Sequence, residues 1–421
     1  MTALAPEPTA RFLRRAAPAL GVGFALTFAS SFGQTYFLSL FGGVWRETFS
    51  LSHGQFGGLY TAATLASAGG LLVLGKVVDR YAPPQVGIAL LALTALAATS
   101  LAFAGGVVML ALGLFAVRML GQGLLSHVGM TAMAKWFDAA RGRALGIAML
   151  GFPVGEALLP PLVASGLVLI GWRWVWLAVA AACLLALAPT VAALATSVRR
   201  GRLDDDAAEG PAGAEATRTD SWTRAQVLRD WRFYAAAPGL LSTPFIITSV
   251  LFHQVFLVET KGWTLTQFAS LFPLYAAAST GAGLACGRLV DAYGARRILP
   301  YYLLPLVVGL VALTASNAFG VAVVFMALTG ATAGAAVIIY TALWAELYGP
   351  AHIGAIRAVA GSALVLSSAI GPGLCGALID AGVSLDAQLR AMAAYAALCA
   401  VLFAPLQNRM TRRPPPSDAA K

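Results

Sequence analysis

The sequence predicts an all-helical integral membrane protein in which twelve transmembrane helices form two pseudo-symmetric six-helix bundles. Of the 421 residues, 59% are hydrophobic and only 11% are charged, a composition that soluble domains of this length do not have. About twelve apolar runs of roughly 20 residues or more recur along the chain, and each can cross a hydrocarbon core of about 30 Å as a helix. An internal repeat supports the division into halves.

Hydropathy alone gives the expected position of each helix. The first six spans are predicted at residues 16–41, 54–75, 85–104, 106–133, 143–170 and 174–196, and the other six at 233–258, 264–287, 297–316, 318–345, 353–379 and 387–408. We interpret the first as an uncleaved helix, because no clear small-residue cleavage site follows it. The four cysteines stand singly in apolar runs, so neither a disulfide framework nor a metal site is expected.

The basic residues predict the orientation. Of the 28 Lys and Arg residues, Arg118 lies inside the membrane and only four lie on the outer side, namely Arg46, Arg173, Lys261 and Arg390. By the positive-inside rule both termini are expected in the cytoplasm, in a multi-pass protein of the inner or plasma membrane. Because the net charge of +10 is spread over loops rather than gathered on one face, no nucleic-acid partner is indicated.

The predicted organisation is two bundles joined by a linker. Residues 1–198 form the N-terminal six-helix bundle, and residues 233–421 form the C-terminal bundle with a short cytoplasmic tail. Residues 199–232 are charged and rich in Ala and Gly, which predicts a disordered cytoplasmic linker ending in a short amphipathic helix from Ser221 to Trp231.

The two halves repeat each other at an offset of about 212 residues. The matching positions are Gly69 and Gly281, Gly75 and Gly287, Asp79 and Asp291, and Tyr81 and Tyr293. An even number of helices per half gives parallel repeats, which place a binding site between the halves near the midplane.

Two loops carry related motifs, GKVVDRYAPP from Gly75 and GRLVDAYGARR from Gly287. They resemble the loop signature G-x-x-x-D-R-x-G-R-[RK] of the major facilitator superfamily, and the resemblance implies that fold and a cytoplasmic gate of charge-assisted contacts. The expected gate residues are Gly75, Asp79, Arg80, Asp138, Arg141, Gly287, Asp291, Arg296, Glu346 and Arg357. Glu346 and Asp138 are expected to pair with Arg357 or Arg141. The alternative is a charged loop that only fixes topology.

Arg118 is the charged residue expected near the bilayer midplane. An Arg at that depth is costly unless it faces water or a partner, so it is a functional candidate. Its surroundings, RMLGQG, resemble the superfamily's helix-four signature, which implies a role in proton coupling or substrate binding. The alternative is a structural role in which Arg118 donates to carbonyl groups of a neighbouring helix.

Glu156 is a second charged residue inside a span. Gly142, Gly151 and Gly155 keep the spacing of the superfamily's antiporter signature, but Glu156 stands where that signature has Pro. We hypothesise an ion pair between Arg118 and Glu156, in which protonation of Glu156 releases Arg118 for an anion. The alternative is that Glu156 is a static counter-ion.

Polar residues in the first, seventh and tenth helices suit hydrogen bonding to a small polar ligand. They are Gln34, His253, Gln254 and Tyr340. The alternative for His253 is a hydrogen bond to a backbone carbonyl at the membrane interface. His53 and His127 are assigned surface or packing roles.

The segments FGQTYFLSLFGG and ELYG are similar to the monocarboxylate and oxalate/formate branch of the superfamily. This resemblance implies secondary active, proton-coupled transport of a small organic anion by alternating access, with protons or a counter-solute as the coupling partner. No ATP-binding P-loop occurs, so transport is expected to draw on ion or solute gradients. The four histidines are widely scattered, so no enzymatic activity is expected, and we expect no cofactor, no metal and a monomer. Because helix eight has no basic residue before Arg288, proton-coupled efflux of hydrophobic compounds is an alternative, and a non-transporting sensor or scaffold is another.

Overall fold

The backbone is helical almost throughout. The structure, a computed structural model, describes residues 9–137, 140–200 and 221–410, and no strand occurs in them. Eleven helices of this described chain are long and apolar enough to cross a membrane, and one further apolar helix, α19 (Leu304–Ala315), is shorter. The prediction of an all-helical membrane protein built from twelve apolar helices is confirmed.

The chain divides into two compact units, each packed mainly against itself. The first unit comprises Met1–Phe37, Ala66–Gly155 and Gly166–Pro211, and the second comprises Leu38–Leu65, Glu156–Ser165 and Ala212–Lys421. The second unit therefore contains two segments that precede the linker in the chain. Two helices, α4 (His53–Leu74) and α10 (Gly151–Leu169), belong partly to each unit.

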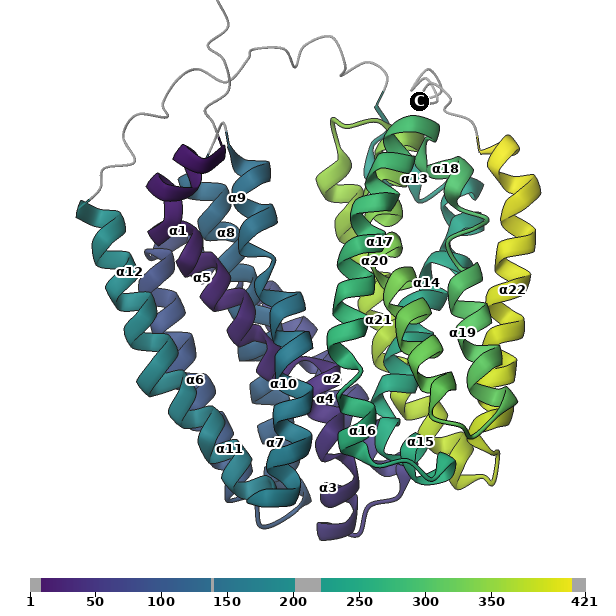
Figure 1. Ribbon diagram of the computed structural model, residues 1–421. Helices are drawn as coiled ribbons and strands as arrows, with labels where there is room; N and C mark the ends of the chain where they lie inside the picture. Colours follow the sequence, from purple (N-terminus) through teal and green to yellow (C-terminus); the bar gives the residue numbers. More distant parts are fainter. Residues whose placement is uncertain (1–8, 138–139, 201–220, 411–421) are drawn as a thin grey trace, which may run out of the picture. The chain divides into compact units, whose positions relative to one another are not determined.

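The first unit is built around α1, which packs against α8, α9 and α12, while α6 packs against α7, α11 and α12 (Figure 1). Its elements are α1 (Thr9–Ala29), η1 (Ser30–Gly33), α5 (Val77–Arg80), α6 (Pro83–Ala102), α7 (Val107–Val117), η3 (Arg118–Leu125), α8 (Ser126–Trp136), α9 (Arg141–Ala148), α11 (Trp172–Ala181), η4 (Ala182–Leu187) and α12 (Ala188–Arg200). A buried cluster that includes Phe12, Leu20, Met133 and Phe137 joins α1 to α8 and α9. This cluster holds α1 in place.

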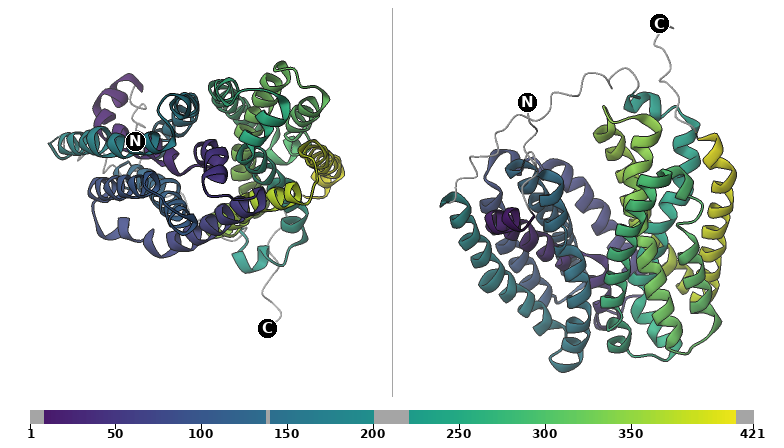
Figure 2. Two further views of the ribbon diagram at one scale, coloured as in Figure 1. Left: turned by 90° about the horizontal axis from the view of Figure 1, so that it is seen from below. Right: turned by 45° about the horizontal axis from the view of Figure 1, so that its top comes forward.

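The long helices of the second unit pack side by side. Its elements are α2 (Thr35–Leu38), at the boundary between the units, then η2 (Ser39–Phe41), α3 (Gly42–Thr48), α13 (Arg224–Val227), α14 (Trp231–Phe252), α15 (Gln254–Lys261), α16 (Leu265–Ala269), α17 (Phe272–Tyr293), α18 (Ala295–Ile298), α19 (Leu304–Ala315), α20 (Gly320–Tyr348), α21 (Ile353–Asp380) and α22 (Leu385–Arg409). Helix α17 packs against α20, and α14 packs against α21. Helix α22 lies at the edge of the unit, against α14 and α19 (Figures 1 and 2).

The first and seventh predicted helices are each interrupted. The span predicted at 16–41 breaks at Gln34, whose backbone is extended (φ −77°, ψ 153°), and the span predicted at 233–258 breaks at His253 (φ −91°, ψ 20°). Ser30 donates from its hydroxyl to the carbonyl of Thr27, a local bond that competes with regular helix geometry.

The ninth predicted helix is shorter than the span of 297–316 that hydropathy indicates. Helix α18 ends at Ile298, and α19 begins only at Leu304. Pro300 lacks a backbone N–H and its ring would clash with the preceding turn, so it ends the first piece. Pro305 stands at the start of α19, where its missing N–H costs nothing.

The chain enters the C-terminal helices through a compact polar corner. The predicted amphipathic helix from Ser221 to Trp231 is observed as α13, only four residues long, which a capping box between Thr223 and Gln226 begins. Trp222 is buried under the guanidinium of Arg232, 4.8 Å from its ring centroid. The rest of the predicted linker, residues 201–220, lies outside the described residues.

Candidate functional site

Arg118 lies at the start of η3, a π-helical segment in the span Val107–Trp136. Its side chain is only 4% exposed, and its Nη1 donates to the carbonyl oxygen of Gly33 at 3.2 Å. The wider turn of a π-helix commonly marks functional positions in helices. The structure therefore places this cation inside the first unit, against the broken end of the first helix.

Two glycines make this arrangement possible. A Cβ atom at Gly121 would lie 2.9 Å from the backbone nitrogen of Gly33, and one at Gly33 would collide with the carbonyl of Val117. Only glycine lets the backbones of η1 and η3 approach this closely. The close approach brings the Gly33 carbonyl within reach of Arg118.

Glu156 follows Gly155 in α10, and its side chain is partly exposed. The hypothesised ion pair between Arg118 and Glu156 stays a prediction.

Three of the four predicted ligand-binding polar residues donate a side-chain hydrogen bond within the second unit. His253 donates from Nε2 to the carbonyl of Pro372 at 3.1 Å, and Gln254 donates from Nε2 to the hydroxyl of Ser39 at 2.7 Å. Tyr340 donates from its hydroxyl to a backbone carbonyl, that of Arg357, at 3.2 Å. Gln34, at the break of the first helix, is partly buried. A role of these four residues in ligand binding stays a prediction.

A clasp that sequence reasoning missed joins the start of α4 to the end of α21 within the second unit. The carboxylate of Asp380 accepts hydrogen bonds from the Ser52 hydroxyl at 2.6 Å, the His53 amide at 3.1 Å and the Gly54 amide at 2.8 Å. The first amides of a helix have no partner within it, and a negative charge there also interacts favourably with the helix dipole. Asp380 therefore caps α4 from 327 residues away in the chain.

Close backbone packing continues along these two helices. A Cβ atom at Gly57 would press on the Pro372 carbonyl and lie 3.1 Å from the α-carbon of Gly373. The hydroxyl of Thr61 donates to the carbonyl of Ala369 at 2.6 Å. Small residues on both helices thus allow a tight crossing of the kind common in membranes.

Ionisable side chains surround the clasp. Nη1 of Arg46 donates to Nε2 of His53, and the His53 ring lies 6.0 Å from the ring of His253. Partial burial lowers the pKa of the Arg46 guanidinium below its ordinary value, against the opposing effect of Glu259 and Asp380. The cluster combines opposite charges and two imidazoles at one end of the helices.

The predicted gate residues form two local ion pairs. In the first unit, Lys135 lies 3.7 Å from the carboxylate of Asp79 and also donates to the Val78 carbonyl at 2.7 Å. In the second unit, Nε of Arg296 lies 3.6 Å from Oε1 of Glu346, and the Arg296 amide donates to the same carboxylate. Each pair ties a motif loop to a neighbouring helix.

The remaining gate residues lie around these pairs. Glu346 contacts Arg296 rather than its expected partner Arg357, because α18 brings the Arg296 amide and side chain to the carboxylate; Arg357 instead donates to the Thr341 carbonyl at 2.7 Å. Gly75 lies beside His127: Nε2 of His127 is 3.2 Å from the carbonyl oxygen of Gly75. Arg80, Arg141 and Asp291 are exposed, Gly287 is partly buried, and Asp138 lies outside the described residues.

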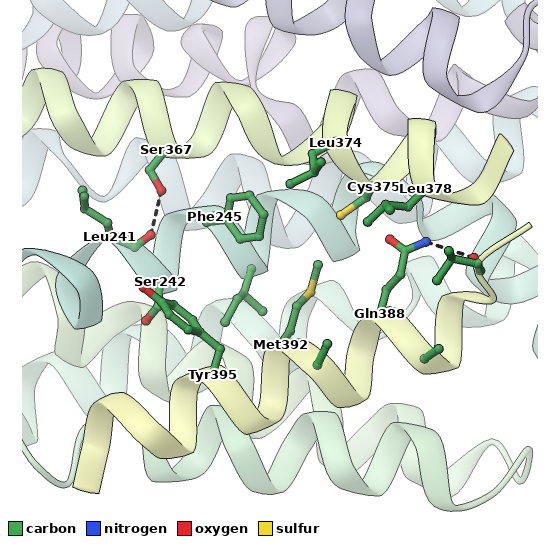
Figure 3. Close-up of a pocket in the computed structure, with 14 residues that line it drawn as sticks. Leu241, Ser242, Phe245, Ser367, Leu374, Cys375, Leu378, Gln388, Met392 and Tyr395 are labelled. Atoms are coloured by element: carbon green, nitrogen blue, oxygen red, sulfur yellow. Dashed lines mark hydrogen bonds between the residues drawn. The ribbon is translucent and has the colours of Figure 1, made fainter. Parts of the chain in front are cut away.

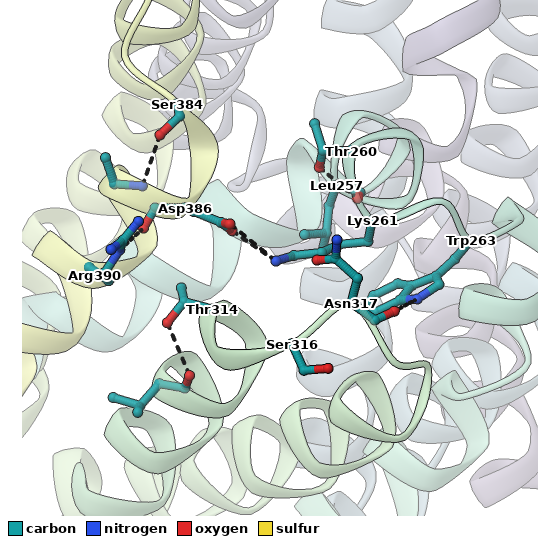
Figure 4. Close-up of polar contacts among 12 residues, drawn as sticks. Leu257, Thr260, Lys261, Trp263, Thr314, Ser316, Asn317, Ser384, Asp386 and Arg390 are labelled. Atoms are coloured by element: carbon teal, nitrogen blue, oxygen red, sulfur yellow. Dashed lines mark hydrogen bonds and ion pairs between the residues drawn. The ribbon is translucent and has the colours of Figure 1, made fainter.

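An ion pair between a buried lysine and a partly exposed aspartate lies at the start of α22 (Figure 4). Nζ of Lys261, at the end of α15, lies 3.0 Å from Oδ1 of Asp386, and the Lys261 side chain is almost fully buried. The indole N–H of Trp263 donates to the Asn317 carbonyl at 2.7 Å. Side chains from two connecting segments therefore hold the ends of the helices in the second unit.

No candidate metal-binding site occurs in the part of the chain that the structure describes. No three His, Cys, Asp or Glu side chains gather there in a way that could hold a metal ion. The four cysteines are buried and unpaired with one another.

Comparison with known proteins identifies a family whose sequence profile matches this chain. The sequence profile of the Major Facilitator Superfamily matches residues 23–291 and 240–421. A protein of Thermoproteus tenax, described as an uncharacterized 38 kDa protein in the 23S RNA operon, is 27% identical over 347 residues, which cover 82% of this chain and 83% of that protein.

Two solved structures share the fold. Both are crystal structures of a bacterial homologue of the human lysosomal transporter Spinster in an inward-facing conformation. The unoccupied form has a TM-score of 0.68 at 16% identity, covering 94% of this chain and 97% of that chain. The occupied form has a TM-score of 0.64 at 16% identity, covering 95% and 97%.

Proposed function

Because the chain belongs to the Major Facilitator Superfamily, and is therefore a membrane transporter rather than an enzyme, we propose that it couples proton movement to the transport of a small organic anion such as a monocarboxylate. The observation that carries this proposal is the buried guanidinium of Arg118 within a membrane span. A cation held at such depth costs free energy, which binding of an anion offsets.

Glu156 is the proposed proton carrier. Its carboxyl group lies in a membrane span, in the residue after Gly155. In the protonated state the carboxyl no longer competes with a substrate anion for the Arg118 cation. Ionisation of Glu156 then favours release of the substrate, so proton and anion binding are linked.

Alternating access requires contacts that break at either end of the helices. We propose that the Asp79–Lys135 and Arg296–Glu346 pairs belong to the cytoplasmic gate, and that the Asp380 clasp belongs to the outer gate. Contacts of this kind can be exchanged for water at little cost when a gate opens.

In the proposed topology the protein spans a bacterial-type inner membrane or a plasma membrane, and both termini lie on its cytoplasmic side. It divides the chain into bundles 1–198 and 233–421 around the linker 199–232, in a monomeric protein. The distribution of Lys and Arg supports the orientation. Reporter fusions at residue 421, active only on one side of the membrane, test it, and an outside C-terminus contradicts it.

The decisive test of substrate class uses purified protein in proteoliposomes. We expect a change of internal pH on adding one or more small carboxylates, lost in both Arg118→Gln and Glu156→Gln. Arg390→Gln and Glu47→Gln are matched controls, because both side chains are exposed. If no carboxylate changes the internal pH in the wild type, the anion proposal fails.

A second candidate, proton-coupled efflux of hydrophobic compounds, is favoured by one contact. Arg118 donates to the Gly33 carbonyl, as a structural arginine does. Under this alternative, the same liposomes accumulate or expel an apolar fluorescent dye when a pH gradient is imposed, and Arg118→Gln lowers the melting temperature rather than abolishing carboxylate flux.

A further inference from the structure

A groove in the second unit is lined by none of the residues assigned above to transport. Helices α14, α21 and α22 surround a cavity of about 490 Å³, and Figure 3 shows its lining. The volume falls in the range of pockets that enclose small ligands. Phe245, Leu374, Cys375 and Met392 contribute apolar walls, and none of the lining residues is charged.

Most polar groups of the groove already donate to helix carbonyls. The hydroxyl of Ser367 donates to Leu241 at 2.8 Å, that of Ser242 to Gly239 at 2.6 Å, and that of Tyr395 to Pro238 at 3.2 Å. The bonds of Ser367 and Tyr395 hold α14 against α21 and α22, whereas the bond of Ser242 lies within α14. They leave the groove with an almost entirely apolar character.

Gln388 is the exception. Its side chain is 4% exposed, and its Nε2 donates to the Val383 carbonyl at 3.1 Å. Because a carbonyl only accepts, this bond fixes which end of the amide is nitrogen and which is oxygen. The oxygen, Oε1, has no hydrogen-bond partner among the described residues, and Figure 3 shows it on the side of the amide facing Cys375. A buried acceptor in this state costs free energy until a donor reaches it.

The position of Gln388 gives the site a direction. It lies one turn after the start of α22 at Leu385, while Tyr395 lies two turns further on, roughly 10 Å along the helix. The groove therefore has an amide oxygen at one end, near the end of the span, and hydroxyl groups that already donate at the other, with apolar walls between them. Leu374 and Tyr395 at its rim are 47% and 44% exposed.

We propose that this groove binds a neutral lipophilic alcohol from the bilayer, whose hydroxyl donates to Oε1 of Gln388 and whose apolar body lies against Phe245, Leu374 and Met392. The absence of charge in the lining disfavours anions and phosphate headgroups, which would lose their hydration without a partner. An ordinary acyl chain fills the apolar part but leaves Oε1 without a donor. The site shares no residue with the proposed anion site and does not depend on it.

The test uses the full-length protein in nanodiscs and a photoreactive long-chain alcohol carrying a diazirine. Mass spectrometry is expected to locate cross-links in peptides of α14, α21 and α22. Unlabelled 1-dodecanol competes, and its methyl ether, which lacks the donor, competes about fivefold less well, as loss of one ordinary hydrogen bond implies.

Three variants make the result specific. Gln388→Leu is expected to abolish the difference between the alcohol and its ether, because the acceptor is gone. Ala391→Trp fills the rim and is expected to remove cross-linking, while Ala394→Trp, an exposed position on the same helix outside the lining, leaves it unchanged. Melting temperatures confirm that each variant is folded.

Two results overturn the proposal. Equal competition by the alcohol and the ether in the wild type identifies the occupant as a bulk acyl chain. Cross-links outside these three helices show that the groove does not take the alcohol. Neither result bears on carboxylate flux, so this proposal and the anion proposal fail independently.

Discussion

Replacing Asp380 by Ala removes the cap from the start of α4. The carboxylate accepts three hydrogen bonds, from the Ser52 hydroxyl at 2.6 Å, the Gly54 amide at 2.8 Å and the His53 amide at 3.1 Å. Those amides belong to the first turn of α4, where no helix carbonyl can accept from them. Their protection from solvent therefore depends on Asp380.

The expected cost follows from two effects. Loss of a capping side chain costs about 0.5–2 kcal/mol, and loss of a negative charge at a helix N-terminus costs about 0.3–1 kcal/mol. Because Asp380 is exposed and its charge is screened, we expect a total of about 1–2 kcal/mol. Local opening of this end of α4 should increase about 5- to 30-fold.

Hydrogen exchange followed by mass spectrometry measures this directly. Peptides covering residues 51–58 should exchange about 5- to 30-fold faster in Asp380→Ala than in the wild type. Asp386→Ala is the control, since Asp386 lies at the same end of the unit but pairs with Lys261. Unchanged exchange in Asp380→Ala, or equal acceleration in the control, refutes the assignment of Asp380 as the cap.

Three further substitutions test the packing described above. Gly121→Ala should lower the melting temperature markedly, because its Cβ atom meets the backbone of η1, whereas Gly69→Ala, with no atom within 4 Å, should not; equal melting temperatures contradict the close approach. Asp230→Asn removes the anion 2.6 Å from the buried Arg232 and should destabilise the protein by about 3–5 kcal/mol in denaturant titrations, and a change below about 1 kcal/mol argues against a buried pair. Tyr302→Phe loses one buried hydrogen bond, to the Gly239 carbonyl at 2.8 Å, and should cost about 1 kcal/mol in the same titrations; no measurable loss would mean that the bond contributes nothing.

Hydropathy predicted the spans because a helix that crosses lipid needs a long apolar run, and this requirement is local in sequence. The interruptions were harder to predict. Pro300 and Pro305 could have indicated the short ninth helix, since each lacks a backbone N–H. The break at His253 has no such signal, because its conformation follows from contacts with α21.

The candidate site divides in the same way. Arg118 stands out in sequence, since a charge in an apolar run needs an explanation. Asp380 and His53 do not, because each lies near the end of a span, where polar residues are ordinary. Gln388 is equally inconspicuous, and only the bond of its amide nitrogen to Val383 reveals the acceptor left facing the groove.

The clasp also has a consequence for how the protein is made. Asp380 is synthesised 327 residues after His53, which takes roughly 15–65 s at ordinary elongation rates of about 5–20 residues per second. During that interval the first turn of α4 has been synthesised, but the residue that caps it has not. In the same way, Ser39 is synthesised well before Gln254, the residue that donates to its hydroxyl. The segment Leu38–Leu65 therefore completes its contacts only after α21 is made, so its final placement comes late in biogenesis although it is among the first parts of the chain to reach the membrane.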